Sequence, residues 1–262
     1  KIIKTAKQVG ADAIKIQTYN PDSLTIASKR KEFVIKKGLW KNYTLYNLYK
    51  KASTPLDWQK ELFCQAKKIG ITIFSTPFDI KGLEILEKLN SPAYKIASFE
   101  LVDLDLIQNV AKTKKPLILS TGMASKDEIN DAINIIYKSG CKKLILLHCV
   151  SGYPTPVNEI NLSCIHELKK QYDVLVGLSD HSVNNTVPLV AASLGACLIE
   201  KHFTLSRILY KSPDSNFSLE PKEFKELCIQ TKNIKTIIGK PNYKLNKSER
   251  EMIKIRRSLY IV

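Results

Sequence analysis

The sequence predicts an α/β fold, a (β/α)8 (TIM) barrel that lacks its first strand. Short apolar runs alternate with helical stretches along the whole chain, punctuated by glycine and proline. Polar residues gather where the apolar runs end, as they do at the catalytic face of such barrels. The chain opens inside a helical pattern, KIIKTAKQVG, with no strand before it, so seven strand units are found, one short of a closed barrel.

The strands are predicted from seven runs rich in β-branched and other apolar residues. They cover residues 13–18, 72–78, 93–98, 116–122, 143–150, 174–179 and 196–203. Helical patterns lie between or after them, at residues 81–89, 126–139, 162–171, 187–194 and 220–239. Because the strands are almost continuously apolar, we expect parallel pairing in a sheet that is covered on both faces.

A doubly wound open sheet is the main alternative to the barrel. Such a sheet usually carries a glycine-rich nucleotide-binding turn, and neither GxGxxG nor GxxxxGK followed by Ser or Thr occurs in this chain. The barrel domain is therefore assigned to residues 1–240 and a linker to residues 241–262. Residues 21–58 are too many for an ordinary loop between a strand and a helix, and we expect them to form part of a substrate lid.

Composition argues against several classes of protein. With 262 residues, 44% hydrophobic and 25% charged, the chain suits one large domain with a substantial core. It contains neither an apolar run long enough to cross a membrane nor a signal peptide, which predicts a cytoplasmic protein with no membrane partner. The formal net charge is +16, but the lysines fall mostly in pairs near predicted helix ends, without a nucleic-acid-binding motif. We therefore expect no nucleic-acid partner.

Two histidines stand at the ends of consecutive predicted strands, His181 in GLSDHS and His202 in LIEKHFTL. If these strands are parallel neighbours in a barrel, both imidazoles project into one mouth, where a divalent metal could take a nitrogen from each. This pattern favours an enzyme. The competing interpretation is that each imidazole is simply solvated or hydrogen-bonded at its strand end.

Two lysines lie within apolar strands, Lys15 in KIQT and Lys95 in YKIAS. A buried ammonium is costly unless it meets an anion or a carbonyl, so both are candidates for binding phosphate or carboxylate. The alternative is a structural ion pair with an interior carboxylate. Other polar side chains at the strand ends complete a candidate substrate site. They are Gln17, Thr18, Ser98, Glu100, Ser120, Tyr153 and Ser179.

Seven segments resemble, in order and spacing, the sialic acid synthase family. They are GADAIKIQTYNPDSLT, STPF, AYKIASFE, STGMAS, HCVSGYPTP, GLSDHS and GACLIEKHFTL, and the resemblance covers almost the whole chain. Within the family, the pieces KIQTYNPDSLT, KKGLW, LYNLYKKASTPLDW and SPDSNFSLEPKEF are most similar to the branch that makes pseudaminic acid.

The resemblance implies a metal-dependent condensation of phosphoenolpyruvate, an open-chain 2,4-diacetamido-2,4,6-trideoxy-altrose and water to pseudaminic acid and phosphate, with C–O cleavage. It implies that His181 and His202 are ligands of Mn²⁺ or Mg²⁺. By the same resemblance Gln17 and Asp214 contact the sugar, and Glu100 orients or deprotonates the attacking water unless it is paired with a lysine. The residues implied to hold phosphoenolpyruvate are Lys15, Lys95, Ser98, Ser120 and Tyr153.

The chain departs from the family pattern at both ends. The family's first strand, with its acidic motif, is absent, and the chain ends at RRSLYIV, where family members continue into a small antifreeze-like domain. In the family that domain reaches across a dimer to the partner's sugar site. The resemblance therefore implies that this chain is a fragment or a truncated product and that the full-length protein is a homodimer.

Three other functions remain open on the sequence alone. An N-acetylneuraminate or legionaminate synthase would use the same site with another N-acylated hexose. A Schiff-base aldolase on the same barrel would use Lys15 or Lys95 as its nucleophile and would need no metal. A non-catalytic basic protein would retain DNA or RNA in a strongly salt-dependent way.

Overall fold

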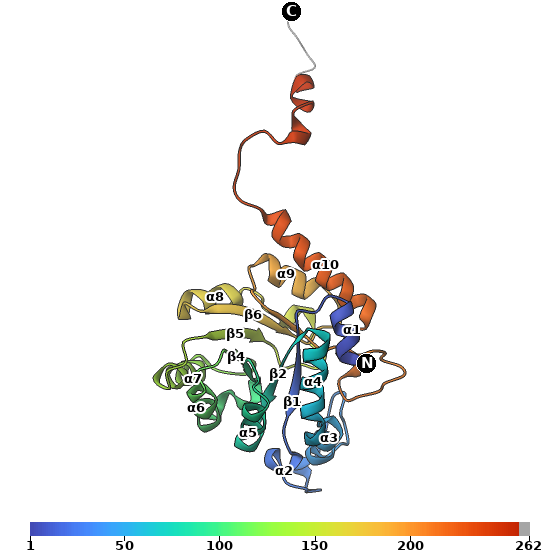
Figure 1. Ribbon diagram of the computed structural model, residues 1–262, viewed down its shortest axis with the longest axis vertical. Helices are drawn as coiled ribbons and strands as arrows, with labels where there is room; N and C mark the ends of the chain where they lie inside the picture. The colour runs from blue at the N-terminus through green and yellow to red at the C-terminus, as the bar shows by residue number, and fades with distance from the viewer. Residues whose placement is uncertain (257–262) are drawn as a thin grey trace, which may run out of the picture.

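A parallel sheet of seven strands forms the centre of the fold. The computed structural model describes residues 1–256 (Figure 1). The strands lie in chain order, and each pairs in parallel with the next. They are β1 (Ala13–Thr18), β2 (Thr72–Pro77), β3 (Tyr94–Ile96), β4 (Leu117–Ser120), β5 (Leu144–Cys149), β6 (Leu175–Asp180) and β7 (Ile199–Lys201). Since parallel strands end on the same edge of the sheet, the side chains that follow them collect there.

Helices connect successive strands and surround the sheet (Figure 1). They are α1 (Ile2–Gln8), α2 (Pro21–Leu24), α3 (Leu45–Ala52), α4 (Gln59–Ile69), α5 (Ile80–Lys88), α6 (Leu104–Lys112), α7 (Lys126–Lys138), α8 (Cys164–Tyr172), α9 (Thr186–Ser193) and α10 (Pro221–Ile238). Five of them begin at a side chain that accepts a hydrogen bond from a backbone N–H of the first turn, namely Asn20, Thr44, Asp79, Asp103 and Ser125. Local sequence therefore sets where these helices start.

The predicted alternation of strands and helices is confirmed, and so is the helical start of the chain, in α1. All seven predicted strands are present, although β3 and β7 are shorter than the predicted 93–98 and 196–203. Residues after β3 turn into a short 3-10 helix, η3 (Ser98–Val102), which ends the strand early. Within residues 1–256 neither β1 nor β7 has a second strand beside it, so the sheet keeps two open edges and this part of the chain does not form a closed eight-stranded barrel.

Side chains alternate between two faces of the sheet along each strand, as the pleat requires. In β4, Leu117 and Leu119 are fully buried in the large core shared with the helices. Ile118 points to the other face, where it packs with Phe74 of β2 and Leu147 of β5 in a cluster to which no helix contributes. We call this second face the inner face. Its apolar cluster supports the polar residues that follow on the same face toward the strand ends.

The inner face is packed closely enough to require a glycine in β6. A Cβ atom on Gly177 would lie 2.3 Å from the carbonyl oxygen of Leu198 and 2.8 Å from Cδ2 of Leu147. Because backbone cannot move aside as a flexible side chain can, no other residue fits at this position. The close approach holds β5, β6 and the residues before β7 together below the strand ends that carry the histidines.

The segment predicted as a lid has little regular structure. Between α2 and α3 it forms 3-10 helix η1 (Lys31–Phe33) and a turn closed by an antiparallel bridge of Val34 with Thr44. A second 3-10 helix, η2 (Leu56–Trp58), leads into α4. Within residues 21–58, Trp40 contacts the loop that carries Asp214.

The chain beyond α10 leads away from the sheet (Figure 1). It contains two short 3-10 helices, η6 (Lys247–Glu249) and η7 (Met252–Ile255). The predicted linker at 241–262 includes residues 257–262, which lie outside the described residues. Across residues 1–256, every helix is too short or too polar to span a membrane.

Candidate active site

Three charged side chains meet on the inner face of the sheet near the strand ends. Lys15 of β1 donates to Oε1 of Glu200 in β7 at 2.9 Å, and Lys95 of β3 lies 4.0 Å from the same oxygen. Ser179 of β6 donates to that oxygen at 3.2 Å. The two lysines therefore lie on the same face and meet one carboxylate, Glu200. This contact is the ion pair with an interior carboxylate that the sequence analysis gives as the alternative interpretation of the lysines.

The charges of this cluster shift one another's ionisation. Burial opposes ionisation of Glu200, but the ammonium groups of Lys15 and Lys95 outweigh it and hold the pKa of this carboxyl well below its usual range. Burial lowers the pKa of Lys95 to about 8, although Glu200 pulls it upward. Two positive charges face one negative charge, so this cluster attracts an anion.

Hydroxyl groups and a glycine lie beside the lysines. Lys95 donates to Oγ of Ser120 at 2.5 Å, and the N–H of Gly122 donates to Oγ of Ser98 at 3.1 Å. A Cβ on Gly122 would lie 2.5 Å from Oγ of Ser151 and 2.7 Å from Oγ of Ser98, so only glycine leaves these hydroxyls room. Ser151 and Thr76 each bury a hydroxyl oxygen that has no hydrogen-bond partner within the described residues. Unpaired buried hydroxyls are costly, and a bound anion would satisfy them.

Ser151 and Thr76 have no role in the site predicted from the sequence, although Thr76 lies near the end of β2 and Ser151 follows β5. Thr76 lies two residues after the inner-face residue Phe74, and that period of two is the signal that could have identified it.

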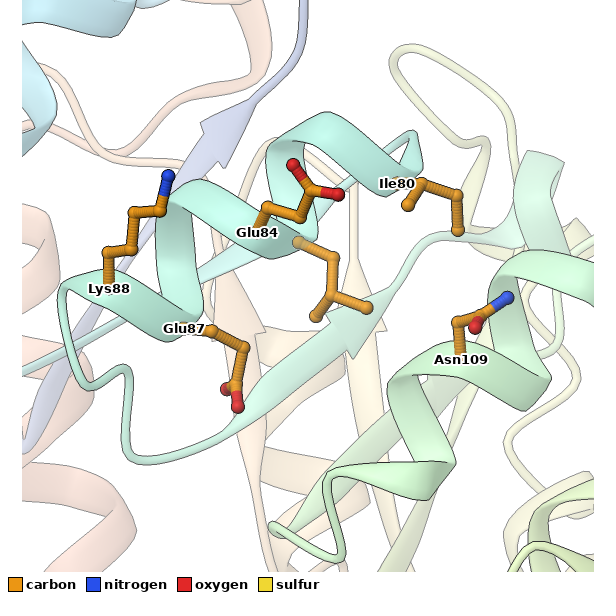
Figure 2. A pocket seen from close by; sticks show the side chains of 6 residues that line it. Ile80, Glu84, Glu87, Lys88 and Asn109 are labelled. Carbon is orange, nitrogen blue, oxygen red and sulfur yellow. The ribbon is translucent and has the colours of Figure 1, made fainter.

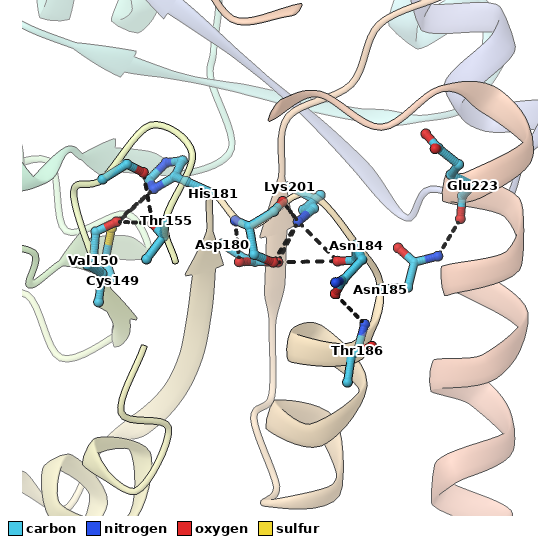
Figure 3. Close-up of polar contacts among 12 residues, drawn as sticks. Cys149, Val150, Thr155, Asp180, His181, Asn184, Asn185, Thr186, Lys201 and Glu223 are labelled. Carbon is cyan, nitrogen blue, oxygen red and sulfur yellow. Dashed lines mark hydrogen bonds and ion pairs between the residues drawn. The ribbon is translucent and has the colours of Figure 1, made fainter. Parts of the chain in front are cut away.

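The two histidines converge at the carboxyl ends of β6 and β7. Their ring centroids are 5.5 Å apart. Nδ1 of His181 lies 3.1 Å from the carbonyl oxygen of Val150, so a proton on Nδ1 is satisfied there and Nε2 keeps its lone pair (Figure 3). Burial, and then the neighbouring imidazole of His202, lower the pKa of His181 to about 4. At neutral pH this ring is uncharged, which is the form that binds a metal.

Asp214 lies beside the second histidine, with its Oδ2 3.4 Å from Nδ1 of His202. A carboxylate at this nitrogen orients the ring and leaves the other nitrogen for a ligand. Within residues 1–256 no group of three or more His, Cys, Asp or Glu side chains is arranged to hold a metal. The two imidazoles fit a divalent ion whose remaining positions are open to water or substrate, and they do not fit a closed structural site.

A buried ion pair lies behind the histidines, on the opposite face of the same two strands. Nζ of Lys201 is 2.5 Å from Oδ2 of Asp180, and their side chains are only 1% and 2% exposed. These residues are register partners in the pairing of β6 with β7. Figure 3 shows Asp180 directed toward Lys201 while His181 is directed toward Val150. The pair ties together the strand ends that carry the imidazoles, and the sequence prediction did not include it.

Glu100 is held close to the lysines by η3. Burial raises the pKa of its carboxyl to about 7, although Lys95 and Lys15 pull it downward. Its Oε2 is buried without a hydrogen-bond partner, and Glu100 makes no ion pair within the described residues. The alternative that Glu100 is paired with Lys95 is therefore not what the structure shows, since the carboxylate near Lys95 is Glu200. A carboxyl that titrates near neutral pH in a cavity can act as a general base.

An aromatic cluster packs against the two histidines. Tyr153 packs against His181 with ring centroids 4.5 Å apart and ring planes inclined at 51°, and Phe217 lies edge-on to His202 at 4.8 Å. Tyr153 and Phe217 are themselves 5.3 Å apart. The predicted substrate residue Tyr153 is thus part of the wall of the site.

The two remaining substrate candidates on β1 lie on opposite faces. Gln17 lies two residues after Lys15 and therefore on the same inner face. Thr18 lies on the outer face, fully buried, where its hydroxyl donates to Oε1 of Gln59 at 3.0 Å and lies 2.7 Å from Oγ of Ser75. The alternation of strand side chains turns Thr18 away from the cavity. We therefore leave Thr18 out of the proposed site.

A separate groove of about 530 Å³ lies in the outer helix layer, between α5 and α6 (Figure 2). It is lined by Ile80, Leu83, Glu84, Glu87 and Lys88 of α5 and by Asn109 of α6. None of these residues belongs to the cluster at the strand ends. The groove has no part in the chemistry proposed below.

Comparison with known proteins identifies the family. Residues 2–243 match the NeuB family. The chain belongs to the NeuB family. Among its relatives, this NeuB chain is 44% identical to pseudaminic acid synthase of Helicobacter pylori, over 98% of this chain and 75% of the relative. It is 38% identical to N,N'-diacetyllegionaminic acid synthase of Campylobacter jejuni, over 99% of this chain and 78% of the relative.

A solved structure confirms the fold of this NeuB chain. The N-acetylneuraminic acid synthetase of Leptospira borgpetersenii, determined in complex with citrate, superposes with a TM-score of 0.83 and 36% identity. The match covers 98% of this chain and 85% of that one. The described residues of this chain therefore share the parallel α/β architecture of that structure.

Proposed function

We propose that this chain carries the condensation site of a pseudaminic acid synthase, a phosphoenolpyruvate-dependent transferase that forms a C–C bond. Its similarity to pseudaminic acid synthases along almost its whole length carries the proposal. The paired lysines, the unpaired hydroxyls and the convergent imidazoles support it, because they offer separate places for an anion and for a divalent ion. The sugar is 2,4-diacetamido-2,4,6-trideoxy-altrose in its open-chain form.

The lysines and hydroxyls bind phosphoenolpyruvate. Lys15 and Lys95 neutralise its phosphate and carboxylate, while Ser98, Ser120 and the N–H of Gly122 supply hydrogen bonds. Ser151 and Thr76 join them with the hydroxyls that lack partners. Gln17, Ser179 and Asp214 contact the substrates from the strand ends and from the loop beside His202.

The reaction joins C3 of phosphoenolpyruvate to the aldehyde carbon of the sugar, whose oxygen takes up a proton. Water adds its oxygen to C2 and gives a proton to Glu100, which a pKa near 7 allows. The bond between C2 and the phosphate oxygen then breaks, and the C2 hydroxyl gives its proton to the departing phosphate as C2 becomes a ketone. Glu100 returns the proton it took from water, which balances the proton taken up by the aldehyde oxygen. Bound between His181 and His202, Mn²⁺ or Mg²⁺ would supply Lewis-acid polarisation of the sugar aldehyde.

The finer features of the family belong to the same proposal. An eighth strand between the open edges of β1 and β7 would close the barrel, since Lys15 and Glu200 already meet across that gap. By the same proposal, the protein acts in the cytoplasm as a homodimer.

Product identification tests the proposed function. The full-length natural protein is incubated with phosphoenolpyruvate, Mn²⁺ and a panel of N-acylated hexoses, and phosphate release and product mass are measured. When the trideoxy-altrose is the sugar supplied, we expect phosphate and pseudaminic acid to form in equal amounts. Selective turnover of another hexose would assign the chain to a legionaminate or N-acetylneuraminate synthase, which the 38% identical relative favours as the second candidate.

The same incubation separates a synthase from an aldolase. The lowered pKa of Lys95 is the observation that favours Schiff-base chemistry, because it increases the fraction of free amine. A synthase loses turnover in a chelator and gains no mass when borohydride is added with a keto acid. An aldolase keeps its turnover in a chelator and gains mass when borohydride is added with a keto acid.

A further inference from the structure

The turn between η1 and α3 brings a tryptophan to the site from far along the chain. The N–H of Ile35 donates to the carbonyl of Tyr43, and that of Asn42 to the carbonyl of Ile35, both at 2.9 Å. Gly38 and Asn42 adopt positive φ angles of 80° and 72°, which close the turn tightly. Trp40 stands between them, so its position is set by the backbone of the turn.

Trp40 contacts the loop that carries Asp214. Its indole Nε1–H donates to the carbonyl oxygen of Pro213 at 2.9 Å, a contact between residues 173 apart in sequence. The next residue, Asp214, places its carboxylate beside His202. The hydrogen bond therefore acts on the backbone directly before the carboxylate that orients a candidate metal ligand.

The rest of this loop, residues 205–216, holds mainly to itself. The Oγ of Ser215 donates to the carbonyl of Tyr210 and accepts from the N–H of Ser212. Its tip is open to solvent, with Ile208 and Leu209 each 78% exposed. Arg207 fixes only the start of the loop, by an ion pair with Glu223 of α10. Trp40 supplies a tie at the other end, next to the site.

The Trp40 ring also joins the aromatic cluster beside the histidines. Its centroid lies 5.3 Å from that of Tyr153 and 6.4 Å from that of Phe217. Tyr153 packs against His181, and Phe217 lies edge-on to His202. One side chain therefore contacts the wall beside both imidazoles as well as the Asp214 loop.

We propose that Trp40 is a positioning residue that latches the 205–216 loop over the imidazole pair and thereby sets the affinity for the sugar substrate. This inference rests on the proposed function, in which Asp214 contacts the sugar. The indole N–H holds the loop, and the ring supports Tyr153. Loss of the N–H frees Asp214, whereas loss of the whole ring also disturbs the residue that contacts phosphoenolpyruvate.

Two substitutions separate these contributions. Trp40→Phe keeps an aromatic ring and removes the N–H, and we expect the KM for the sugar to rise about three- to tenfold, as for the loss of one hydrogen bond. The KM for phosphoenolpyruvate should stay unchanged. Trp40→Ala should raise both KM values. Trp58→Phe is the matched control, because Trp58 is the second of two tryptophans in the chain and is 58% exposed.

Proteolysis reports on the latch without any activity. Lys211 is exposed in the loop, and the bond after it is open to trypsin once the loop detaches. We expect Trp40→Phe to speed cleavage after Lys211 several-fold, and Trp58→Phe to leave the rate unchanged. If the wild-type protein showed no turnover but cleavage after Lys211 were still faster in Trp40→Phe than in Trp58→Phe, the proposed function would be wrong and the role of Trp40 in holding the loop would be supported.

Either of two results would overturn the inference. The first is an unchanged cleavage rate after Lys211 in Trp40→Phe. The second is an equal rise in both KM values in Trp40→Phe, which would mark a general loss of structure.

Discussion

At the scale of single residues, the same kinds of side chain do different work according to where they lie. Glu200 and Glu100 are both carboxylates near Lys95, yet one pKa is pushed far down and the other up to about 7. The difference follows from contact, since Glu200 accepts a hydrogen bond from Lys15 and Glu100 makes no ion pair within the described residues. Glu200 is thus a fixed counter-charge, and Glu100 is free to exchange a proton.

Replacing either buried lysine tests its part in anion binding. Lys15→Met and Lys95→Met each remove one desolvated charge contact, which should cost on the order of 2–3 kcal/mol, or about 30- to 150-fold in KM for phosphoenolpyruvate. Steady-state kinetics at saturating sugar measures this. Lys4→Met, at an exposed position of α1, is the control and should change nothing. Wild-type KM values in both site variants would show that the lysines serve only to pair with Glu200.

The raised pKa of Glu100 makes a pH prediction. A general base works in its deprotonated form, so kcat should fall as pH drops through about 7 and level off above it. Glu100→Gln should lose a hundredfold or more in kcat and no longer show this limb, while phosphoenolpyruvate binding remains. A pH profile of kcat for both proteins measures the effect. An acidic limb that persists in Glu100→Gln would assign the base to another group.

At the scale of elements, the spacing of the imidazoles depends on how β6 and β7 are joined. Their last register pair is Asp180 with Lys201, which lies on the outer face, while the histidines that follow return to the inner face. Ser182 adds two hydrogen bonds to Asp180, from its N–H and its hydroxyl. The strand ends are therefore fixed by polar contacts just where the apolar pairing stops.

Breaking this buried pair should destabilise the fold strongly. Asp180→Asn or Lys201→Met leaves one buried group without its partner and should lower the free energy of unfolding by roughly 3–5 kcal/mol. The double variant Asp180→Leu with Lys201→Met removes both charges and should lose much less. Denaturant unfolding of the three variants gives the comparison. If the single variants are as stable as the wild type, the Asp180–Lys201 pair does not stabilise the pairing of β6 with β7.

At the scale of the whole molecule, the sequence predicts what repeats locally and misses what depends on distant contacts. The period of apolar runs predicts all seven strands, and the parity of side chains along them places Lys15, Lys95 and both histidines on one face. The same alternation along β1 would have predicted that Thr18 lies on the outer face, opposite to Lys15. The partner of Lys15 lies 185 residues away and that of Trp40 lies 173 away, and no local pattern signals either contact. The early end of β3 also escapes prediction, because it depends on the turn into η3.

The path of one oxygen atom tests the central claim most directly. If water adds to C2 and the C–O bond breaks, the bridging oxygen of phosphoenolpyruvate leaves with the phosphate. Full-length protein is therefore given the trideoxy-altrose and phosphoenolpyruvate that carries a heavy oxygen isotope at the bridging position, and both products are analysed by mass spectrometry. The mechanism predicts the label in inorganic phosphate and none in the sugar. Label retained at C2 of the sugar would show P–O cleavage and contradict it.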